Sequence, residues 1–341
     1  MKRDNRAFTL IELLVVIAIV ALLVSILLPT LGGARATART TQCAGNIRAV
    51  GLGVASYVAD QRYFPPAYVY GAETTGSYWR VEDQKKKPEF PENGYIHWSY
   101  SLFENGGTVA EEAFQCPTLP RRGAPRTNPG PDPENWEPGQ INGVGQGPPG
   151  AATPQDRQAR RIAYTGNHAI FPRNKFTPAA NERSDRLVNG SGVDASAKGA
   201  AGVILATEFA YYNDWRSLYD PDDNVIKSHR PVTPFVGGSS PDVYREPDIG
   251  DEPRFFYPNK SSIYPVSRIG ESMIVDANST LNAVGRHHPG GSKDFGGTAN
   301  FVFVDGHVEQ SNILDTVTKR QWGDRFYCLT GRNNKVSWQD F

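Results

Sequence analysis

The sequence lacks the short motifs that mark common enzymes and metal proteins. It has only three cysteines, Cys43, Cys116 and Cys328, and no two of them have the CxxC spacing of a zinc ribbon or a redox motif. There is no Gly-x-Ser-x-Gly elbow, P-loop, HExxH helix or paired-carboxylate signature. The sequence therefore predicts a protein that is not an enzyme.

The chain also lacks an excess of charge of either sign. Lys and Arg together number 36, as do Asp and Glu, so the formal net charge is +0. A balanced chain has no overall electrostatic field to attract nucleic acid or an acidic surface. We therefore expect no nucleic-acid partner.

What the sequence does have is a long apolar run near its N-terminus. Within residues 8–28 the only charged side chain is that of Glu12. About 21 helical residues span roughly 30 Å, the thickness of the hydrocarbon core of a bilayer. Lys2, Arg3 and Arg6 precede the run, and a short basic tail of this kind stays in the cytoplasm. We expect a single pass through a bacterial inner membrane, with the rest of the chain outside the cytoplasm.

Glu12 is the unusual member of this run, because a carboxylate within lipid costs a few kcal/mol or more and is normally given a partner. A cut between Ala7 and Phe8 would create an α-amine that a neighbouring copy of the helix could deliver to the acid. Two alternatives to a cut at this bond remain open. The first is an ordinary secretory signal cleaved near Ala34-Arg35-Ala36, although such signals have a shorter apolar stretch than this one. The second is a plain membrane anchor, although it leaves the acid without a partner.

The string FTLIELLVVIAIV at residues 8–20 resembles the N-terminal methylation segment of type IV pilins and type II secretion pseudopilins. This resemblance implies that a prepilin peptidase removes residues 1–7 as a leader and methylates the new amine of Phe8. It also implies that Glu12 pairs with that amine in an adjacent subunit during fibre assembly. The family usually has Gly where this chain has Ala7; a small residue is kept, so we expect cleavage.

The expected membrane and assembly helix covers residues 8–29 and ends at Pro29, the place where helices of the pilin family commonly kink. A second helical segment is expected after this proline. Over residues 30–62 the spacing of apolar residues predicts an amphipathic stem helix with one buried face. The residues of this face are Leu31, Ala34, Ala38, Ile47, Val50, Val54, Tyr57 and Val58. Gly51 and Gly53 each weaken a helix by about 1 kcal/mol relative to Ala, so we expect a sheet packed on this face to hold it.

Strings spread over most of the chain resemble the DUF1559 family, a large pilin-like group. They include the stem at residues 27–66 and the shorter strings Phe114-Gln115-Cys116-Pro117 and Tyr164-Thr165-Gly166-Asn167. The resemblance implies a large-headed pilin-like protein.

The C-terminal part of this resemblance is to the family's H-X9-DG motif, carried here by Arg286, His287, His288, Asp305 and Gly306. In this chain 16 residues, 289–304, separate the second histidine from the aspartate instead of nine, which implies a Gly-rich insertion at residues 290–297.

The head, residues 63–341, is expected to be rich in β-structure. An apolar run at residues 301–304, an Asp-Gly dipeptide typical of a type I′ turn and a return at residues 307–310 predict a hairpin. Further short strands are predicted at residues 202–207, 271–276 and 325–329. The predicted fold class is α+β and pilin-like, with the long helix packed on an antiparallel sheet. Residues 117–160, rich in Pro, Gly, Asn and Gln, are expected to form a long surface loop.

Metal sites are weakly indicated. His287, His288, His307, Asp305 and Glu309 would converge on a transition metal, or serve an exported metallohydrolase, only if the hairpin folded back, and no ligand spacing supports this. Oxygen-bearing side chains in the string DPDDN offer a weak calcium site, but without an EF-hand pattern a solvated turn is favoured. These side chains are Asp220, Asp222, Asp223 and Asn224. We expect no cofactor.

The three cysteines leave the disulfide pairing open. A disulfide between Cys116 and Cys328, with Cys43 free on the stem, is one arrangement open to an extracytoplasmic protein.

We expect a structural subunit that polymerises with other pilin-like subunits in a type IV pilus or a type II secretion-like pseudopilus. The alternative is a membrane-anchored module that binds an envelope component or a polysaccharide through aromatic side chains in polar surroundings. These are Tyr95, Trp98, Tyr100, Trp136, Tyr211, Tyr212 and Trp215.

Overall fold

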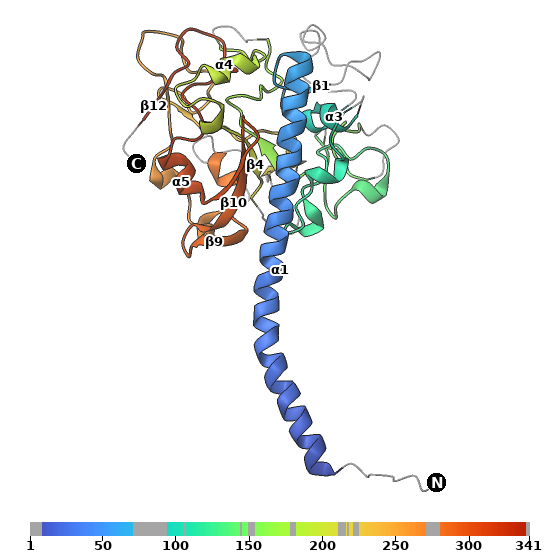
Figure 1. The fold of residues 1–341 in the computed structure, drawn as a ribbon. Helices are drawn as coiled ribbons and strands as arrows, with labels where there is room; N and C mark the ends of the chain where they lie inside the picture. The colour runs from blue at the N-terminus through green and yellow to red at the C-terminus, as the bar shows by residue number, and fades with distance from the viewer. Residues whose placement is uncertain are drawn as a thin grey trace.

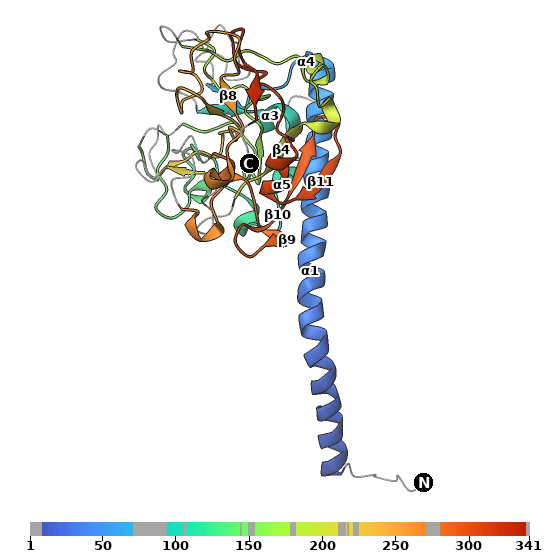
Figure 2. The same cartoon turned by 90° about the vertical axis from the view of Figure 1, so that its left-hand side faces the viewer.

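One helix, α1 (Leu10–Gln61), forms the spine of the molecule and carries the head on its C-terminal half (Figures 1 and 2). The computed structural model describes residues 9–70, 94–104, 107–143, 145–148, 154–177, 182–210, 216, 218–220, 225–270 and 280–338. The arrangement is α+β with a pilin-like layout, as predicted.

Local signals define both ends of α1. Thr9 is the N-cap, with its side chain accepting from the backbone N–H of Glu12, and Arg62 closes the helix in the left-handed conformation with φ of 68°. Pro29 lies within the helix without ending it. The expected membrane and stem segments are therefore parts of one continuous helix, which curves gently below the head (Figure 1).

The buried face of α1 is shorter than predicted. Its buried residues are Thr40, Cys43, Ile47, Val50, Gly51, Gly53 and Val54, at the predicted spacings of three and four. Leu31, Ala34 and Ala38 were predicted on this face but are exposed. The prediction was wrong there because the head covers the helix only from about Thr40 upward (Figure 2).

The main sheet of the head packs against this face. Its strand order is β11 (Val308–Ser311), β10 (Gly296–Phe303), β4 (Ile204–Glu208) and β3 (Tyr164–Gly166), with β9 (His288–Ser292) also paired to β10, and all these pairs are antiparallel. A Cβ at Gly51 would lie 2.5 Å from Cγ2 of Val302. The glycine therefore lets β10 approach the helix backbone, which confirms that a sheet holds this part of α1.

The predicted C-terminal hairpin is β10 and β11, in which Val302 lies opposite Val308. The turn type was predicted wrongly. Gly306 has φ of 89°, but Asp305 does not have a positive φ, as a type I′ turn requires. The N–H of Gly306 donates to the carbonyl of Phe303 and the N–H of Phe303 donates to the carbonyl of His307, both at 2.9 Å. This is a type I turn with a glycine bulge, which also provides the twist that a hairpin needs.

The other strand predictions have mixed outcomes. Residues 202–207 correspond to β4, whereas residues 271–276 lie outside the described residues. Residues 325–329 do not form a strand and make only isolated bridges. The N–H of Phe326 donates to the carbonyl of Asn334 and that of Cys328 to the carbonyl of Ala169, so this segment pairs with two different parts of the chain and no ladder develops.

The segment at residues 117–160 was predicted as a surface loop, but the structure buries much of its described part. Thr127, Asn128, Asp156 and Gln158 are at most 1% exposed. The backbone N–H of Asn128 donates to Oδ2 of Asp156 at 2.9 Å, and its side-chain amide donates to Oδ1 of the same carboxylate. Polar composition did not require exposure, because the buried groups bond one another.

The remaining elements are short. Two pairs of strands are antiparallel: β1 (Tyr68–Tyr70) with β2 (Tyr95–His97), and β5 (Tyr219–Asp220) with β6 (Val225–Ile226). A small sheet contains β7 (Val236–Gly237), β8 (Phe255–Phe256) and β12 (Val336–Ser337), with β12 parallel to β8. The short helices are α3 (Trp98–Phe103), α4 (Gly190–Asp194) and α5 (Ile313–Thr318), with 3-10 helices at Glu111–Phe114, Pro120–Arg122, Pro133–Asn135, Ala200–Gly202, Lys260–Ser262, Val266–Arg268 and Thr280–Ala283. Together they enclose one large core between α1 and the far side of the head.

Candidate functional site

The large apolar side chains of the N-terminal half of α1 are all exposed. Every large hydrophobic residue from Leu10 to Leu28 is among the exposed ones, from 43% for Val24 to 78% for Leu10. Among the described residues, α1 is the one helix long and apolar enough to cross a membrane. A surface of this size and composition requires lipid or other apolar helices as its surroundings.

Glu12 has a local partner that sequence reasoning did not anticipate. Its Oε2 accepts from the backbone N–H of Thr9 at 2.8 Å and from the Thr9 hydroxyl at 2.7 Å, while the Glu12 N–H donates to that hydroxyl oxygen. This capping box satisfies one carboxylate oxygen and two N–H groups of the helix end. Ala7 and Phe8, the predicted cleavage site, lie outside the described residues.

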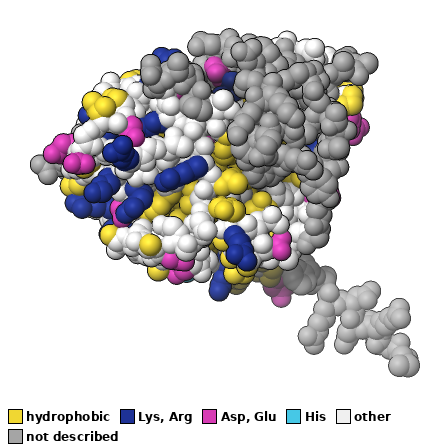
Figure 3. All heavy atoms as spheres, turned by 90° about the horizontal axis from the view of Figure 1, so that it is seen from above, with side chains coloured by type: hydrophobic (Ala, Val, Ile, Leu, Met, Phe, Trp, Pro, Cys, Tyr) yellow, Lys and Arg dark blue, Asp and Glu magenta, His cyan; other side chains and the backbone are white. Residues whose placement is uncertain are grey.

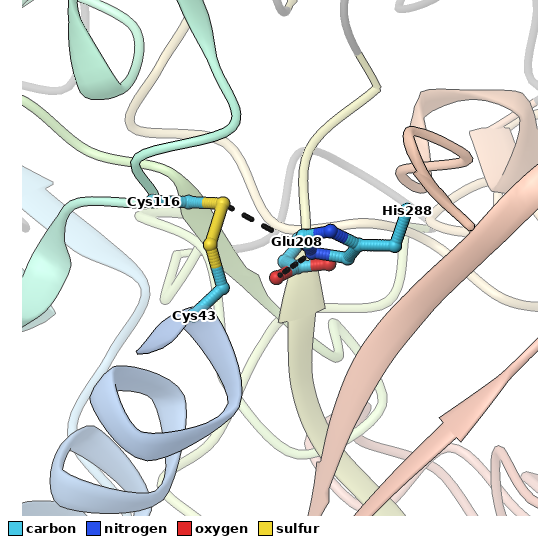
Figure 4. A group of neighbouring side chains, drawn as sticks. All are labelled: Cys43, Cys116, Glu208 and His288. Atoms are coloured by element: carbon cyan, nitrogen blue, oxygen red, sulfur yellow. Dashed lines mark hydrogen bonds and ion pairs between the residues drawn. A yellow bond between two sulfur atoms is a disulfide. The ribbon is translucent and has the colours of Figure 1, made fainter. Parts of the chain in front are cut away.

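Where α1 enters the head, a disulfide joins Cys43 to Cys116, and Cys328 is free (Figure 4). The predicted arrangement of Cys116 with Cys328 was therefore wrong. Cys116 lies two residues after the end of the 3-10 helix at Glu111–Phe114, which packs against α1, so the cysteine that it meets is the one on the helix. The bond makes a covalent connection between the stem and the head.

Beside this disulfide lies Glu208, the last residue of β4, which is fully buried. Its Oε1 accepts from Nε2 of His288 at 2.8 Å and from the side-chain amide of Asn300 at 2.9 Å, and its Oε2 accepts from the Asn300 N–H at 2.9 Å. Burial raises the pKa of this carboxyl, but the hydrogen bond from His288, the charges of His287 and His288 and the amide of Asn300 bring it below its usual value. Glu208 is therefore ionised at neutral pH.

His288 connects this carboxylate to α1. Its Nδ1 lies 3.1 Å from the hydroxyl of Thr40, and that hydroxyl donates to the carbonyl of Ala36 at 3.0 Å. Because the ionised Glu208 can only accept, Nε2 of His288 carries a proton and donates to it. His288 thus joins the buried carboxylate at the end of β4 to the helix α1.

His287 completes the group, which we call the clasp: the Cys43–Cys116 disulfide, Glu208, His287 and His288. Nε2 of His287 lies 3.8 Å from Sγ of Cys116 and 3.7 Å from Oε2 of Glu208. Burial lowers the pKa of His287 to about 4, so this ring is neutral at pH 7. Since both sulfurs are in a disulfide, the clasp has no thiolate for a metal, and its evident role is to fasten the stem to the head.

The structure divides the histidines and acids that were predicted as one candidate cluster. His307 bonds Asp305 at 2.6 Å in the exposed turn and lies 3.7 Å from Glu309. His288 pairs with Thr298 on β10, about five residues or roughly 17 Å along the strand from this turn. These side chains were expected to be structural, and the alternative in which all five converge on one metal does not hold, because His288 lies in β9 whereas Asp305, His307 and Glu309 lie at the far turn.

Sequence reasoning missed Glu208 and Thr40 as members of this site. The available signal was the acid at the end of the apolar string GVILATE, because an ionisable residue inside a core strand needs a partner. Arg286, from the family motif, directly precedes His287 in the chain. Its guanidinium points to other residues, donating to the carbonyl of Tyr264 at 2.6 Å and to Oδ1 of Asn282 at 2.8 Å. It fastens the segment before β9.

The weak calcium candidates are mostly beyond the described residues. Asp222, Asp223 and Asn224 lie outside them, and Asp220 makes an ion pair with Lys227 at 3.5 Å. A calcium site here stays a prediction.

The aromatic residues proposed for ligand binding are largely internal where they are described. Trp98 and Trp136 are 2% and 7% exposed, and Tyr95 stacks on His229. Tyr100 is half-buried, whereas Tyr211, Tyr212 and Trp215 lie outside the described residues. Seen from above, the described surface shows basic and acidic side chains among uncharged ones (Figure 3). Trp98, Trp136 and Tyr95 thus form part of the interior and not a binding platform.

Two family models match the chain. The prokaryotic N-terminal methylation motif matches residues 2–28. A second model, described as a protein of unknown function (DUF1559), matches residues 33–317. The chain belongs to the DUF1559 family. No curated protein and no solved structure matches it.

In this DUF1559 protein the two matched regions meet on α1. The methylation motif covers the exposed apolar half of the helix, and the DUF1559 match begins at residue 33 and includes the clasp. The motif indicates a prepilin-type protein, and the single apolar helix is consistent with a membrane-anchored, pilin-like DUF1559 chain.

Proposed function

We propose that this DUF1559 protein is a structural subunit that a prepilin peptidase cuts before Phe8 and methylates there, and that then joins a type IV pilus or a type II secretion-like pseudopilus. Before assembly it is a single-pass protein of the bacterial inner membrane, with the head outside the cytoplasm. Its partners are the peptidase and other pilin-like subunits.

The observation that supports this proposal is the exposed apolar half of α1 in a chain that carries the N-terminal methylation motif. Lipid solvates these side chains before assembly. In a fibre, neighbouring apolar helices bury one another, and van der Waals packing replaces contacts with lipid. The head, placed at the other end of the helix, would then lie on the outside of the fibre (Figure 1).

The capping box changes what Glu12 needs from a partner. Thr9 bonds one oxygen of the carboxylate, but this leaves its negative charge uncompensated, and no cation among the described residues pairs with it. A charge in lipid costs a few kcal/mol or more even when hydrogen-bonded. The amine of Phe8 from an adjacent subunit would neutralise it, so the capping box orients the acid and assembly supplies the cation.

The first experiment determines the mature N-terminus of the native protein by mass spectrometry. The proposal expects a chain that begins with N-methylated Phe8. An intact N-terminal leader contradicts it and leaves the plain-anchor alternative, and a start near Thr37 indicates an ordinary secretory signal.

The second experiment separates the charge of Glu12 from its capping role. Glu12→Ala is expected to insert in the membrane normally but to assemble at least tenfold less, since it removes the charge that pairs with the amine. Thr9→Val is the matched control, because it removes the capping hydroxyl and keeps the acid, and it should assemble nearly as well as the wild type. Sheared-fibre yield relative to membrane content measures both, and normal fibre yield from Glu12→Val would sink the pairing idea.

A further inference from the structure

A second group of ligand-type side chains, His168, Asp185 and Cys328, lies in the head away from the clasp. They come from three distant segments of the chain, and they are 0%, 3% and 0% exposed. One ligand atom from each lies within 4.8 Å of the other two. Cys328 is the free cysteine of the protein, so its sulfur is available for coordination.

The spacing of these atoms resembles that around a small metal ion. Sγ of Cys328 lies 3.4 Å from Oδ1 of Asp185, and Nε2 of His168 lies 3.9 Å from the same oxygen. Tetrahedral zinc has bonds of about 2.3 Å to sulfur and about 2.0 Å to nitrogen and oxygen, which places neighbouring ligand atoms roughly 3.3–3.6 Å apart. Sγ and Oδ1 are already at such a separation, and Nε2 would have to move toward Oδ1 by roughly half an ångström.

We propose that His168, Asp185 and Cys328 supply three of the four ligands of a buried site for a divalent transition metal, for which Zn²⁺ fits best, with a water molecule as the fourth ligand. Thiolate, imidazole and carboxylate are the three ligand types that zinc uses in proteins, whereas calcium and magnesium avoid sulfur. The clasp has a similar set of residue types, but its sulfurs are bonded to each other. The free thiol is what distinguishes this site.

The neighbours of the three side chains form the outer shell that a metal site requires. Nδ1 of His168 lies 2.9 Å from the hydroxyl of Thr233, whereas Nε2 lies 3.2 Å from the hydroxyl of Tyr244 and 3.9 Å from Oδ1 of Asp185, so Nε2 is the ring nitrogen on the side of the group. Oδ2 of Asp185 accepts from the hydroxyl of Tyr244 at 2.8 Å and from the N–H of Arg173 at 2.8 Å. The other oxygen, Oδ1, is the one that faces the sulfur and the imidazole, so the ligands are oriented before any ion binds.

The protons and charges involved in metal binding at this site can be accounted for. Cys328 donates its thiol proton to the carbonyl of His168 at 2.9 Å, and coordination releases that proton to solvent. The hydroxyl of Tyr244 donates to Oδ2 of Asp185, so Nε2 of His168 carries the ring proton and donates to that hydroxyl. To bind the ion, Nε2 gives up this proton and its bond to Tyr244, and Nδ1 takes up one proton and donates it to Thr233. Asp185 binds as a carboxylate after releasing to solvent any proton that it carries in the metal-free protein, so the two negative charges of the ligands compensate the dication and no oxidant or reductant is involved.

The site would join segments of the head that the disulfide does not connect. His168 follows β3 of the main sheet, whereas Cys328 belongs to the irregular segment that was wrongly predicted as a strand. A metal would join these segments as the disulfide joins the stem to the head. Since all three ligands are buried, the ion has to enter while the chain folds.

The test uses the full-length protein in detergent, unfolded and refolded without reductant in the presence of Zn²⁺ or Co²⁺ and then desalted against a chelator. The amount of metal per chain is measured by inductively coupled plasma mass spectrometry. Charge transfer from the thiolate to cobalt is measured by near-ultraviolet absorption. The wild type should retain one metal per chain and show the charge-transfer band, which can come only from Cys328 while the disulfide is intact.

Variants locate the ion. Cys328→Ser and Asp185→Asn change one ligand each with little change of shape and should lower metal retention at least tenfold. His288→Gln, in the clasp, is the matched control and should retain one metal per chain. A wild type without a charge-transfer band, or metal loss in His288→Gln with retention in Cys328→Ser, overturns the proposal. The wild-type band decides the matter even if a variant fails to fold.

Discussion

Cys43 on α1 and Cys116 in the head are covalently joined, with their Cα atoms 4.9 Å apart across 73 residues of sequence. The bond lies beside the buried pair of Glu208 and His288, and Thr40 of the same helix contacts that histidine. The helix that would lie in a fibre core and the head that would lie on its surface thus meet at one buried, cross-linked point. A force on one is passed directly to the other.

Removing this disulfide should make the head easier to unfold. By loop-closure entropy a cross-link over 73 residues contributes about 4 kcal/mol to the free energy of unfolding. We expect the double variant Cys43→Ser/Cys116→Ser to lose about this amount, measured by urea unfolding of the full chain in detergent with tryptophan fluorescence. Wild-type protein treated with a thiol reductant is the control and should unfold at the same urea concentration as the variant. An unchanged midpoint in both would show that the bond does not stabilise the fold.

Two glycines of α1 provide a matched pair for testing the contact between helix and sheet. A Cβ at Gly51 would lie 2.5 Å from Val302, whereas nothing lies within 4 Å of a Cβ at Gly45. We expect Gly51→Ala to destabilise the head by about 1–3 kcal/mol through overpacking. Gly45→Ala should stabilise the protein by about 0.5–1 kcal/mol, because alanine is the better helix former. Equal effects of the two changes in urea unfolding would contradict the packing of β10 on α1.

His287 should make stability depend on pH between 7 and 5. Its pKa in the folded protein is lowered to about 4 by burial, so the unfolded chain binds a proton below about pH 6.5 that the folded chain does not. Stability therefore falls as the pH falls, by about 2 kcal/mol between pH 7 and pH 5 from this residue. Glu208 contributes little in this window because its carboxyl is ionised in both states.

The variant His287→Gln isolates this contribution, since the amide replaces the ring without titrating. We expect the difference in unfolding free energy between pH 7 and pH 5 to be about 2 kcal/mol smaller in the variant than in the wild type. Other buried histidines, such as His97 with a pKa lowered to about 3, affect both proteins equally. Identical pH dependence in the two proteins would mean that His287 is not buried in its neutral form.

Cleavage between Ala7 and Phe8 can be tested by changing the size of the side chain at position 7. Ala7 stands where Gly is usual in the segment that this chain resembles, and we expect Ala7→Gly to be processed at least as fast as the wild type. Ala7→Ile should accumulate as the uncut form, because a branched side chain does not fit where a small residue is required. The ratio of cut to uncut chain on a gel measures both, and equal processing of the isoleucine variant would contradict cleavage at this bond.

Local pattern alone was sufficient for much of the fold. The apolar run and its single acid predicted the N-terminal half of α1, and the spacing of Ile47, Val50 and Val54 predicted the buried face above it. The Asp305-Gly306 dipeptide between apolar residues predicted the hairpin of β10 and β11. Each depends on the conformations of residues close together in the sequence, where backbone geometry and side-chain periodicity decide the outcome.

Only the tertiary structure decided how distant residues combine. Three cysteines allow three pairings, and which one forms depends on where α1 and the Cys116 segment meet. Burial of Glu208 with His288, and the grouping of His168, Asp185 and Cys328, likewise depend on strands and loops brought together from separate parts of the chain. Local pattern was enough for the membrane-length helix and for the hairpin of β10 and β11, whereas long-range packing determined their partners, because a contact between distant residues leaves no local periodic signal.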